Sequence, residues 1–323
     1  MNYKKQINSE LKHIARNIPY NKVIIKCANI FQTISFHLTR IPKEVTNRTI
    51  TIKGYKGLKF KVEIFEPSNI KETLPCLIYV HGGAFSYKAS AYHKKLACIY
   101  AVKAKCRVYF PDYHLTPKYP YPAAYDDVLA LYKYIMENSE EFRIDNEKIG
   151  IAGDSAGASI AALICSNYEH ENLTRPCFQM LVYPLTDAAM QTASMKKFSD
   201  TPLWNSKNNK RMWLYYCKNL KVEDIYGASP MHSNLPHIIP DTYIETAEYD
   251  CLHDEGILYG KKLQEAGADV EINETRGTIH GYDSALRTKI AVSNIKKRIS
   301  FLKKGFNGCP ASVTSKAVDD IHL

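Results

Sequence analysis

Short runs of apolar or alternating residues recur along the chain at the spacing of β-strands. We expect eight strands, within RTITIKG, LKFKVEIFEP, PCLIYVHGG, CRVYFPDY, KIGIAGDS, FQMLVYP, DTYIETAEYD and DVEINET. The first two alternate with period two and lie close together, which predicts an antiparallel hairpin. Helical patterns separate the later runs, at 92–105, 122–138, 156–168, 254–266 and 283–304. This alternation is typical of an α/β fold, with a mostly parallel sheet flanked by helices.

Two stretches interrupt the alternation of strands and helices. Residues 1–45 are helical in pattern before any strand, and residues 185–235 form a long insertion between two strands. Insertions of this size on an α/β core usually cover a site, so we expect both stretches to form a helical cap. The core is then made of 46–184 and 236–304. The tail, 305–323, is polar and without periodicity, and we expect it to be disordered.

Composition and charge narrow the class of protein. The 323 residues are 45% hydrophobic and 24% charged, which is ordinary for a soluble globular enzyme. The net charge is +10, but the lysines are spread along the chain, so we do not expect a nucleic-acid partner. No run of eighteen apolar residues predicts a membrane span, and the N-terminus lacks the features of a secretory signal. The segment VIIKCANIFQTISFHL is amphipathic; we expect it to pack on the protein, with contact to a membrane surface as the alternative.

The cysteines bear on compartment and cofactors. There are nine, at scattered spacings and without a CxxC pair. This pattern indicates reduced thiols in the cytoplasm rather than a disulfide framework or a zinc site. We therefore expect a cytoplasmic location, no metal and no organic cofactor.

The segment GDSAG, residues 153–157, carries the first candidate for chemistry. It matches G-x-S-x-G, follows a predicted strand and opens a predicted helix, as the nucleophile turn of α/β-hydrolases does. The glycines suit a strained turn in which a Cβ would clash. The turn places Ser155 at a helix N-terminus, where free N–H groups favour developing negative charge. We predict that Ser155 is a nucleophile; a serine N-cap in a glycine-rich loop is the alternative.

A serine hydroxyl needs a general base, which in turn is oriented by a carboxylate. In this fold the residues follow in the order Ser, Asp or Glu, His. Asp250 closes the strand DTYIETAEYD, and His280 follows the strand DVEINET, so both are expected at the carboxyl edge of the sheet. Asp254 is a rival acid, but it falls within the next predicted helix. We therefore predict Asp250 and His280 as the partners of Ser155.

The segment YVHGGAF predicts the donors that stabilise an oxyanion. It follows a strand, and its glycines leave N–H groups free to point at a ligand. A Gly-Gly turn without function is the alternative, and His81 is interpreted as a structural residue. The predicted oxyanion-hole residues are Gly82, Gly83, Ala84 and Ala156.

Together these motifs resemble the hormone-sensitive-lipase-like branch of the α/β-hydrolases, the family IV carboxylesterases. The resemblance rests on HGGAF, DYHLTPKYPYPAAYDD, GDSAG, AEYDCLHDEG and HGY, and it extends from about residue 45 to about residue 304. It implies a mostly parallel eight-stranded sheet with a helical cap, a Ser155, His280 and Asp250 triad, and a possible homodimer through an edge strand such as DVEINE. The chain departs from the family pattern at Ala84, at Cys251 and in TPKYP, none of which removes a catalytic group.

These observations predict a serine carboxylesterase that hydrolyses short- to medium-chain acyl esters through an acyl-enzyme. An amidase or deacetylase of the same fold is one alternative. A non-catalytic ligand-binding homologue, like the plant gibberellin receptors, is another, but those receptors lack the histidine that is present here at His280. The substrate is expected to be a small molecule. The candidates for its binding pocket, with ordinary packing as the alternative, are Asp154, Phe85, Tyr87, Trp204 and Trp213.

Overall fold

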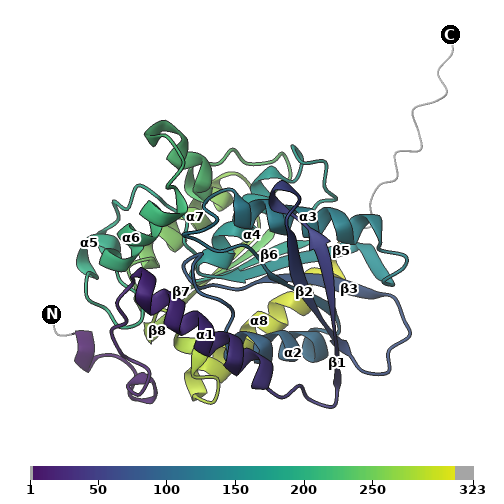
Figure 1. Cartoon of the computed structure of the whole chain (residues 1–323), viewed down its shortest axis with the longest axis horizontal. Helices are drawn as coiled ribbons and strands as arrows, with labels where there is room; N and C mark the ends of the chain where they lie inside the picture. The colour runs from purple at the N-terminus through teal and green to yellow at the C-terminus, as the bar shows by residue number, and fades with distance from the viewer. Residues whose placement is uncertain (1–2, 310–323) are drawn as a thin grey trace, which may run out of the picture.

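The computed structural model describes residues 3–309, and within them eight strands form one sheet (Figure 1). The strand order is β1-β2-β4-β3-β5-β6-β7-β8, in which β1 pairs antiparallel with β2 and β2 with β4, while the other pairs are parallel. The predicted hairpin and the mostly parallel sheet are therefore confirmed. The strands are β1 (Val45–Lys53), β2 (Lys59–Pro67), β3 (Leu74–Val80), β4 (Arg107–Asp112), β5 (Ile144–Asp154), β6 (Phe178–Val182), β7 (Asp241–Tyr249) and β8 (Val270–Ile279).

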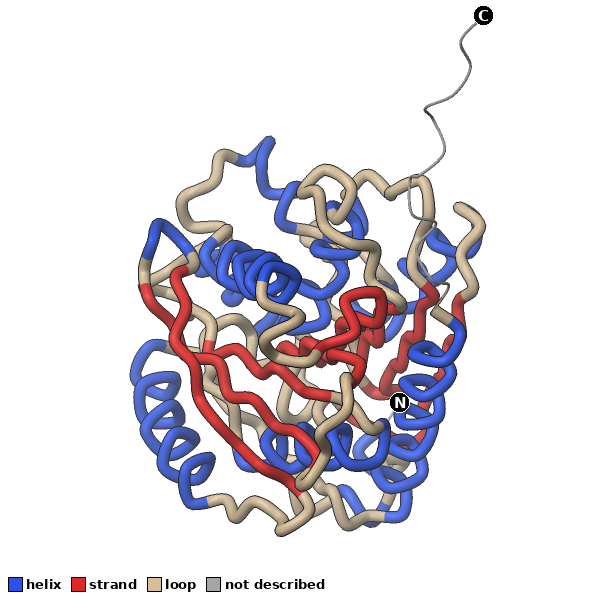
Figure 2. Tube along the Cα trace, turned by 90° about the vertical axis from the view of Figure 1, so that its right-hand side faces the viewer, coloured by secondary structure: helices blue, strands red, loops and turns tan. Residues whose placement is uncertain are grey.

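Helices cover both faces of this sheet. The helices α2 and α8 pack together on one face, and α3 and α4 on the other (Figure 1). In Figure 2 the twisted strands run through the molecule with helices around them. The strand β6 is buried at every position, which explains why four of its five residues are apolar; the exception is Gln179, whose amide donates to Thr242 Oγ1 at 3.0 Å. The flanking helices are α2 (Ala91–Ala104), α3 (Ala123–Glu137), α4 (Ala156–Asn167), α7 (His253–Glu265) and α8 (Lys289–Gly308).

The last helix differs from its predicted bounds at both ends. It begins at Lys289 because a 3₁₀ turn, Tyr282–Ser284, follows the end of β8, and it continues to Gly308. The predicted disordered tail was therefore placed too early, since residues 305–308 are helical. The predicted disorder of residues 310–323 lies outside the described part of the chain.

The two irregular stretches of the sequence meet in space. The carbonyl of Arg16 accepts a hydrogen bond from the Leu203 N–H at 2.9 Å, and the Asn208 amide donates to the carbonyl of Ile18 at 3.0 Å. These contacts join the N-terminal segment to the insertion after β6. The elements concerned are α1 (Lys22–Leu38), α5 (Ala193–Lys197), α6 (Ser206–Tyr216) and the 3₁₀ helices Tyr3–Lys5, Ser9–Leu11, Val222–Ala228 and Pro230–His232.

The cysteines require a correction. Cys177 and Cys309 form a disulfide that joins the segment before β6 to the end of α8, so the prediction of reduced thiols is wrong for this pair. The two residues are 132 positions apart, and only the packing of α8 on the sheet brings them together. Of the seven free cysteines, six are buried as small core residues and Cys27 is exposed. Among residues 3–309 no helix is long and apolar enough to cross a bilayer.

Candidate active site

The turn between β5 and α4 is as tight as the glycine pattern predicts. Ser155 has φ 53°, in a region that a residue with a side chain rarely adopts. A Cβ at position 153 would collide with the backbone of Gly157, and a Cβ at position 157 would collide with the carbonyl of Val80 in β3. Glycine at both positions therefore allows the turn, which leaves the Ser155 side chain at the carboxyl edge of the sheet.

Ser155, His280 and Asp250 form a continuous chain of hydrogen bonds, called here the hydrogen-bond chain. The Ser155 Oγ lies 2.9 Å from His280 Nε2, and His280 Nδ1 lies 2.6 Å from Asp250 Oδ2. Asp250 is fully buried and also accepts the Leu252 N–H at 3.0 Å. When Nδ1 carries its proton toward Asp250, Nε2 of a neutral imidazole accepts the serine hydroxyl. The three residues follow β5, β8 and β7 respectively, so the sheet edge brings them together.

The rival acid, Asp254, lies elsewhere. Its carboxylate accepts the Ser194 N–H at 2.7 Å and contacts His253 Nδ1 at 2.8 Å. Burial raises the pKa of Asp254, but these hydrogen bonds outweigh it and hold the pKa below its ordinary value. Within the described residues Asp254 makes no contact with His280.

The loop after β3 has an unusual backbone beside Ser155. Gly83, Ala84 and Phe85 all have positive φ, at 124°, 54° and 53°. The N–H groups of Gly83 and Ala84, and that of Ala156 at the start of α4, donate no hydrogen bond to any residue that the structure describes. Gly83 and Ala84 border the same cavity as Ser155. Three unpaired donors therefore lie near the hydroxyl.

Gly82 lies beside these donors, with its backbone against the carboxylate of Asp154, and its role in the oxyanion hole stays a prediction. Asp154 is buried and also bonds to the Tyr79 hydroxyl and to His93 Nε2, both at 3.2 Å. Burial raises the pKa of Asp154, but its partners His93 and Gly82 outweigh this, and the pKa lies below the ordinary value. Asp154 thus ties the serine turn to the loop after β3.

His81 is placed as a structural residue, as predicted. Its ring stacks on Tyr113 at 4.5 Å between centroids, and its Nδ1–H donates to the Gly82 carbonyl at 2.6 Å. Burial, with the nearby His93, lowers the pKa of His81 to about 4. The side chain is therefore neutral near pH 7 and holds the loop rather than acting as a base.

A cavity of about 200 Å³ opens beside Ser155 and His280. Tyr87 and Trp204 line it, as predicted, and Asp154 also borders it. Further lining residues that the sequence analysis missed come from the N-terminal segment, from the end of β6 and from the insertion; they are Ile18, Ala28, Gln32, Tyr183, Leu203 and Asn208. Tyr183 directly follows β6, so its place at the carboxyl end of a strand was the available signal.

Two predicted pocket residues are not part of this cavity. Phe85 is fully buried and stacks on the Tyr216 ring at 3.6 Å between centroids. Trp213 packs against the same Tyr216 at 6.0 Å. The prediction is wrong for both: the Phe85 ring joins the loop after β3 to the insertion, and the Trp213 ring packs within α6.

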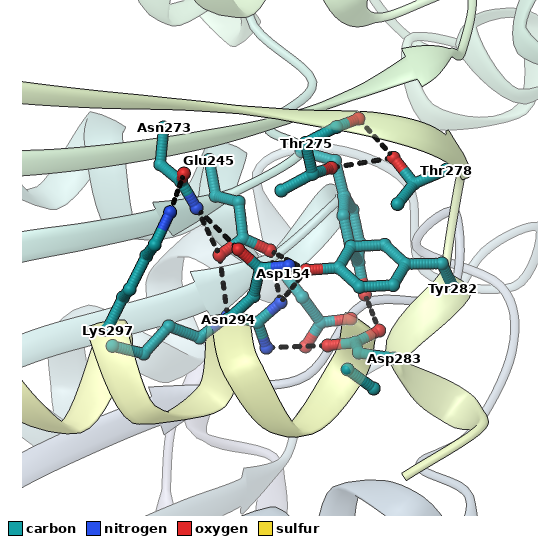
Figure 3. Close-up of polar contacts among 12 residues, drawn as sticks. Asp154, Glu245, Asn273, Thr275, Thr278, Tyr282, Asp283, Asn294 and Lys297 are labelled. Carbon is teal, nitrogen blue, oxygen red and sulfur yellow. Dashed lines mark hydrogen bonds and ion pairs between the residues drawn. The ribbon is translucent and has the colours of Figure 1, made fainter. Parts of the chain in front are cut away.

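A second group of charges, called here the buried cluster, consists of Glu245, Asp283 and Arg298. Figure 3 shows Glu245 and Asp283 of this cluster. The Arg298 guanidinium from α8 lies 2.6 Å from Asp283 Oδ2 and 3.1 Å from Glu245 Oε2. The Tyr282 hydroxyl donates to Glu245 Oε1 at 2.6 Å. Burial raises the pKa of Glu245, but the Arg298 charge outweighs it and holds the pKa below its ordinary value. Asp283 lies three positions after His280, so the cluster fixes that loop.

Comparison with known proteins shows the family to which the chain belongs. The family model of the α/β hydrolase fold matches residues 77–284. The chain belongs to the α/β-hydrolases, in their hormone-sensitive-lipase-like branch. The hydrolase is 30% identical over 275 residues to carboxylesterase NlhH of Mycobacterium tuberculosis, covering 81% of this chain and 83% of that one. It is 33% identical over 212 residues to esterase LipI of the same species, covering 64% and 65%.

Solved structures agree with the fold of the hydrolase. Esterase LipW from Mycobacterium marinum superposes with a TM-score of 0.86 at 24% identity, covering 94% of this chain and 96% of that one. A bacterial heroin esterase superposes with a TM-score of 0.84 at 25% identity, covering 94% and 98%. The hydrolase is thus an enzyme of the carboxylic ester hydrolase class.

Proposed function

We propose that the enzyme is a serine carboxylesterase in which Ser155 is the nucleophile, His280 the general base and acid, and Asp250 the residue that orients the imidazole. The single observation that carries the proposal is the hydrogen-bond chain from Ser155 through His280 to a fully buried carboxylate. Side chains in this hydrogen-bonded arrangement and with these roles hydrolyse acyl groups on several unrelated folds.

The reaction follows from the positions of these groups. Ser155 Oγ attacks the ester carbonyl while His280 Nε2 takes the hydroxyl proton. The tetrahedral oxyanion is stabilised by the free N–H groups of Gly83, Ala84 and Ala156, each worth about 3 kcal/mol in the transition state. The C–O bond then breaks, and the alcohol leaves with the proton from His280. Water, deprotonated by the same imidazole, hydrolyses the acyl-enzyme and restores Ser155.

The size of the cavity favours the short end of the predicted acyl range. A volume of about 200 Å³ is below the roughly 300–1,000 Å³ of sites for drug-sized ligands. The Ala84 methyl group narrows the space further beside the acyl carbonyl. We propose that the N-terminal segment 1–45 and the insertion 185–235 act as a cap, because both contribute side chains to the cavity wall.

The test combines kinetics with covalent labelling. Purified Ser155→Ala should hydrolyse p-nitrophenyl butyrate with a kcat lower by about 10⁵-fold or more, while its thermal unfolding stays close to wild type. A fluorophosphonate probe should label the wild-type protein at Ser155 and leave the variant unlabelled. Retained turnover in Ser155→Ala would remove the mechanism.

The alternatives give different results in the same assays. A non-catalytic ligand-binding homologue would not react with the fluorophosphonate; the 2.9 Å contact between Ser155 and His280 disfavours it. An amidase or deacetylase would also be labelled, but it would turn over the anilide p-nitroacetanilide at a measurable rate, whereas an esterase would leave this substrate nearly intact. A series of p-nitrophenyl esters of increasing acyl length, in which activity falls beyond short chains, would support the proposed substrate class.

The oligomeric state and the cellular location of the enzyme remain predictions. A homodimer through β8 is consistent with the position of this strand at the edge of the sheet, where one side of its backbone has no strand partner among the described residues. The cytoplasmic location was predicted from reduced thiols, and the Cys177–Cys309 disulfide weakens that basis.

A further inference from the structure

The helix α1 exposes a continuous apolar stripe on its outer side. Among the described residues twelve large hydrophobic side chains are exposed, and five of them lie on this one helix, which separates a patch from ordinary scatter. Their spacing of three, four and seven positions puts them on one helical face. This stripe, called here the α1 ridge, consists of Val23, Ile30, Phe31, Ile34 and Leu38, which are 70%, 57%, 71%, 54% and 79% exposed.

The opposite side of α1 is fixed to the body of the enzyme. Asn29 donates to the Ser86 carbonyl at 2.9 Å and accepts the Lys88 N–H at 2.8 Å, next to the loop after β3. The Phe36 ring is buried and stacks on Phe110 at 5.8 Å. The helix also lies against α2 at the surface of the molecule (Figure 1). Because these contacts fix the rotation of the helix, the ridge is held outward.

The charge around the ridge is strongly positive. Residues 1–43 contain eight lysines and arginines and one acidic residue, Glu10, so this segment carries +7 of the net charge of +10. The lysines are spread along the whole chain, but the acidic residues are nearly absent here. The cations closest in sequence to the ridge are exposed and form no ion pair with any described residue; they are Lys22, Lys26, Arg40 and Lys43.

We propose that the α1 ridge and its basic rim dock the enzyme on the surface of an anionic phospholipid bilayer. A helix with an apolar face and cations beside it lies in the plane of a membrane interface, where apolar burial and attraction to anionic headgroups add. A second copy of this chain is disfavoured as the occupant, because a two-fold contact through the ridge would bring two +7 segments together. The mode of attachment is peripheral.

The same helix connects the surface to the site. Ala28 and Gln32, on the inner side of α1, line the cavity beside Ser155, and the Gln32 side-chain oxygen is buried without a partner among the described residues. The helix that docks on the bilayer is therefore also part of the wall of the cavity.

The test is sedimentation of the chain of residues 1–323 with vesicles, read as the fraction of protein in the pellet. Wild type should pellet with phosphatidylcholine vesicles that contain about 30% phosphatidylserine, and much less with phosphatidylcholine alone. Raising the salt from about 0.05 to 0.5 M should lower this binding, because it screens the charges. The readout is independent of hydrolysis, so Ser155→Ala should bind like wild type whether or not the proposed mechanism holds.

Variants distinguish binding through the α1 ridge from nonspecific adsorption to the vesicles. Phe31→Gln with Ile34→Gln should lower the vesicle partition coefficient by about tenfold, and so should Lys22→Glu with Lys26→Glu. Leu214→Gln with Leu258→Gln is the matched control: these side chains are 65% and 47% exposed on α6 and α7 and do not belong to the α1 ridge, so their loss should leave binding unchanged. Circular dichroism and thermal unfolding check that each variant is folded.

Three outcomes would overturn the proposal. One is a wild-type protein that stays in the supernatant with phosphatidylserine vesicles at low salt. Another is an equal loss of binding in the control pair and in the ridge variant. The third is light scattering that shows a dimer which Phe31→Gln with Ile34→Gln dissociates, in a protein that does not bind vesicles.

Discussion

Two groups of buried polar residues hold residues 280–283, the hydrogen-bond chain at His280 and the buried cluster at Asp283. They differ in whether one of their polar groups stays open to the cavity. The hydrogen-bond chain of Ser155, His280 and Asp250 ends at a hydroxyl that borders a cavity. In the buried cluster, by contrast, the Arg298 charge is matched by two carboxylates away from that cavity. The comparison teaches that burial and short hydrogen bonds do not by themselves mark a reactive group. The proposed function rests instead on the hydroxyl that the hydrogen-bond chain leaves open to the cavity.

The largest expected effect lies in the hydrogen-bond chain. Asp250→Asn should lower kcat by about 10⁴-fold, because an asparagine favours the wrong imidazole tautomer while keeping the shape of the site. Asp254→Asn is the matched control, since Asp254 lies four positions away and contacts Ser194 and His253 instead. Steady-state kinetics with p-nitrophenyl acetate measures both. Equal losses in the two variants would mean that the acid was assigned wrongly.

A substitution in the buried cluster should lower the stability of the enzyme more than its kcat. Arg298→Met removes the cation that pairs with Glu245 and Asp283 and leaves two buried carboxylates, so we expect a loss of about 3–5 kcal/mol in the free energy of unfolding. Urea denaturation measures this loss. A variant as stable as wild type would show that the cluster does not hold the loop.

The contribution of Glu245 to the pH dependence of stability should change sign between wild type and Arg298→Met. In wild type the pKa of Glu245 lies below its ordinary value, so its contribution is present above about pH 4.5 and is lost as the pH falls through the folded pKa. In Arg298→Met we expect the pKa of the Glu245 carboxyl to rise above that value, so stability should fall as the pH rises toward 7. Urea midpoints between pH 4 and 7 for both proteins check the sign. Parallel profiles would contradict the assigned role of Arg298.

Local patterns predicted most of the sheet and the residues at its edge. All eight strands appeared as apolar or alternating runs, and the positions of Asp250 and His280 at strand ends were sufficient to bring them to Ser155. The cavity wall was harder to predict, because Ala28 and Gln32 come from a helix whose docking depends on tertiary contacts. Aromatic residues in the insertion could equally pack or bind; Trp204 lines the cavity and Trp213 does not.

Contacts between distant segments also explain the other differences between the predictions and the structure. The close approach of Gly82 to Asp154 and the Cys177–Cys309 disulfide both join segments far apart in the chain. No periodicity within either segment reports such a contact. Likewise, the amphipathic pattern of 23–38 predicted a helix, but not that five apolar side chains of one face would stay exposed on α1.

The smallest expected effect lies at Tyr183, which contacts both the hydrogen-bond chain and the buried cluster. Its ring lies 4.6 Å from the His280 ring, and its hydroxyl donates to Asp283 Oδ1 at 2.7 Å. Tyr183→Phe keeps the ring and removes one hydrogen bond to a buried carboxylate, so we expect a loss of about 1–3 kcal/mol in stability. Because the ring contact with His280 remains, kcat should change far less than in Asp250→Asn.

Comparison with Arg298→Met then tests whether the buried cluster acts as a unit. Both changes act on Asp283, so their effects on the free energy of unfolding should not add, and the double variant should lose less than the sum. Additive losses would mean that Tyr183 and Arg298 hold the loop independently. A loss of kcat in Tyr183→Phe as large as that in Asp250→Asn would break the distinction between the two groups, because it would make the Asp283 contact part of the chemistry at His280.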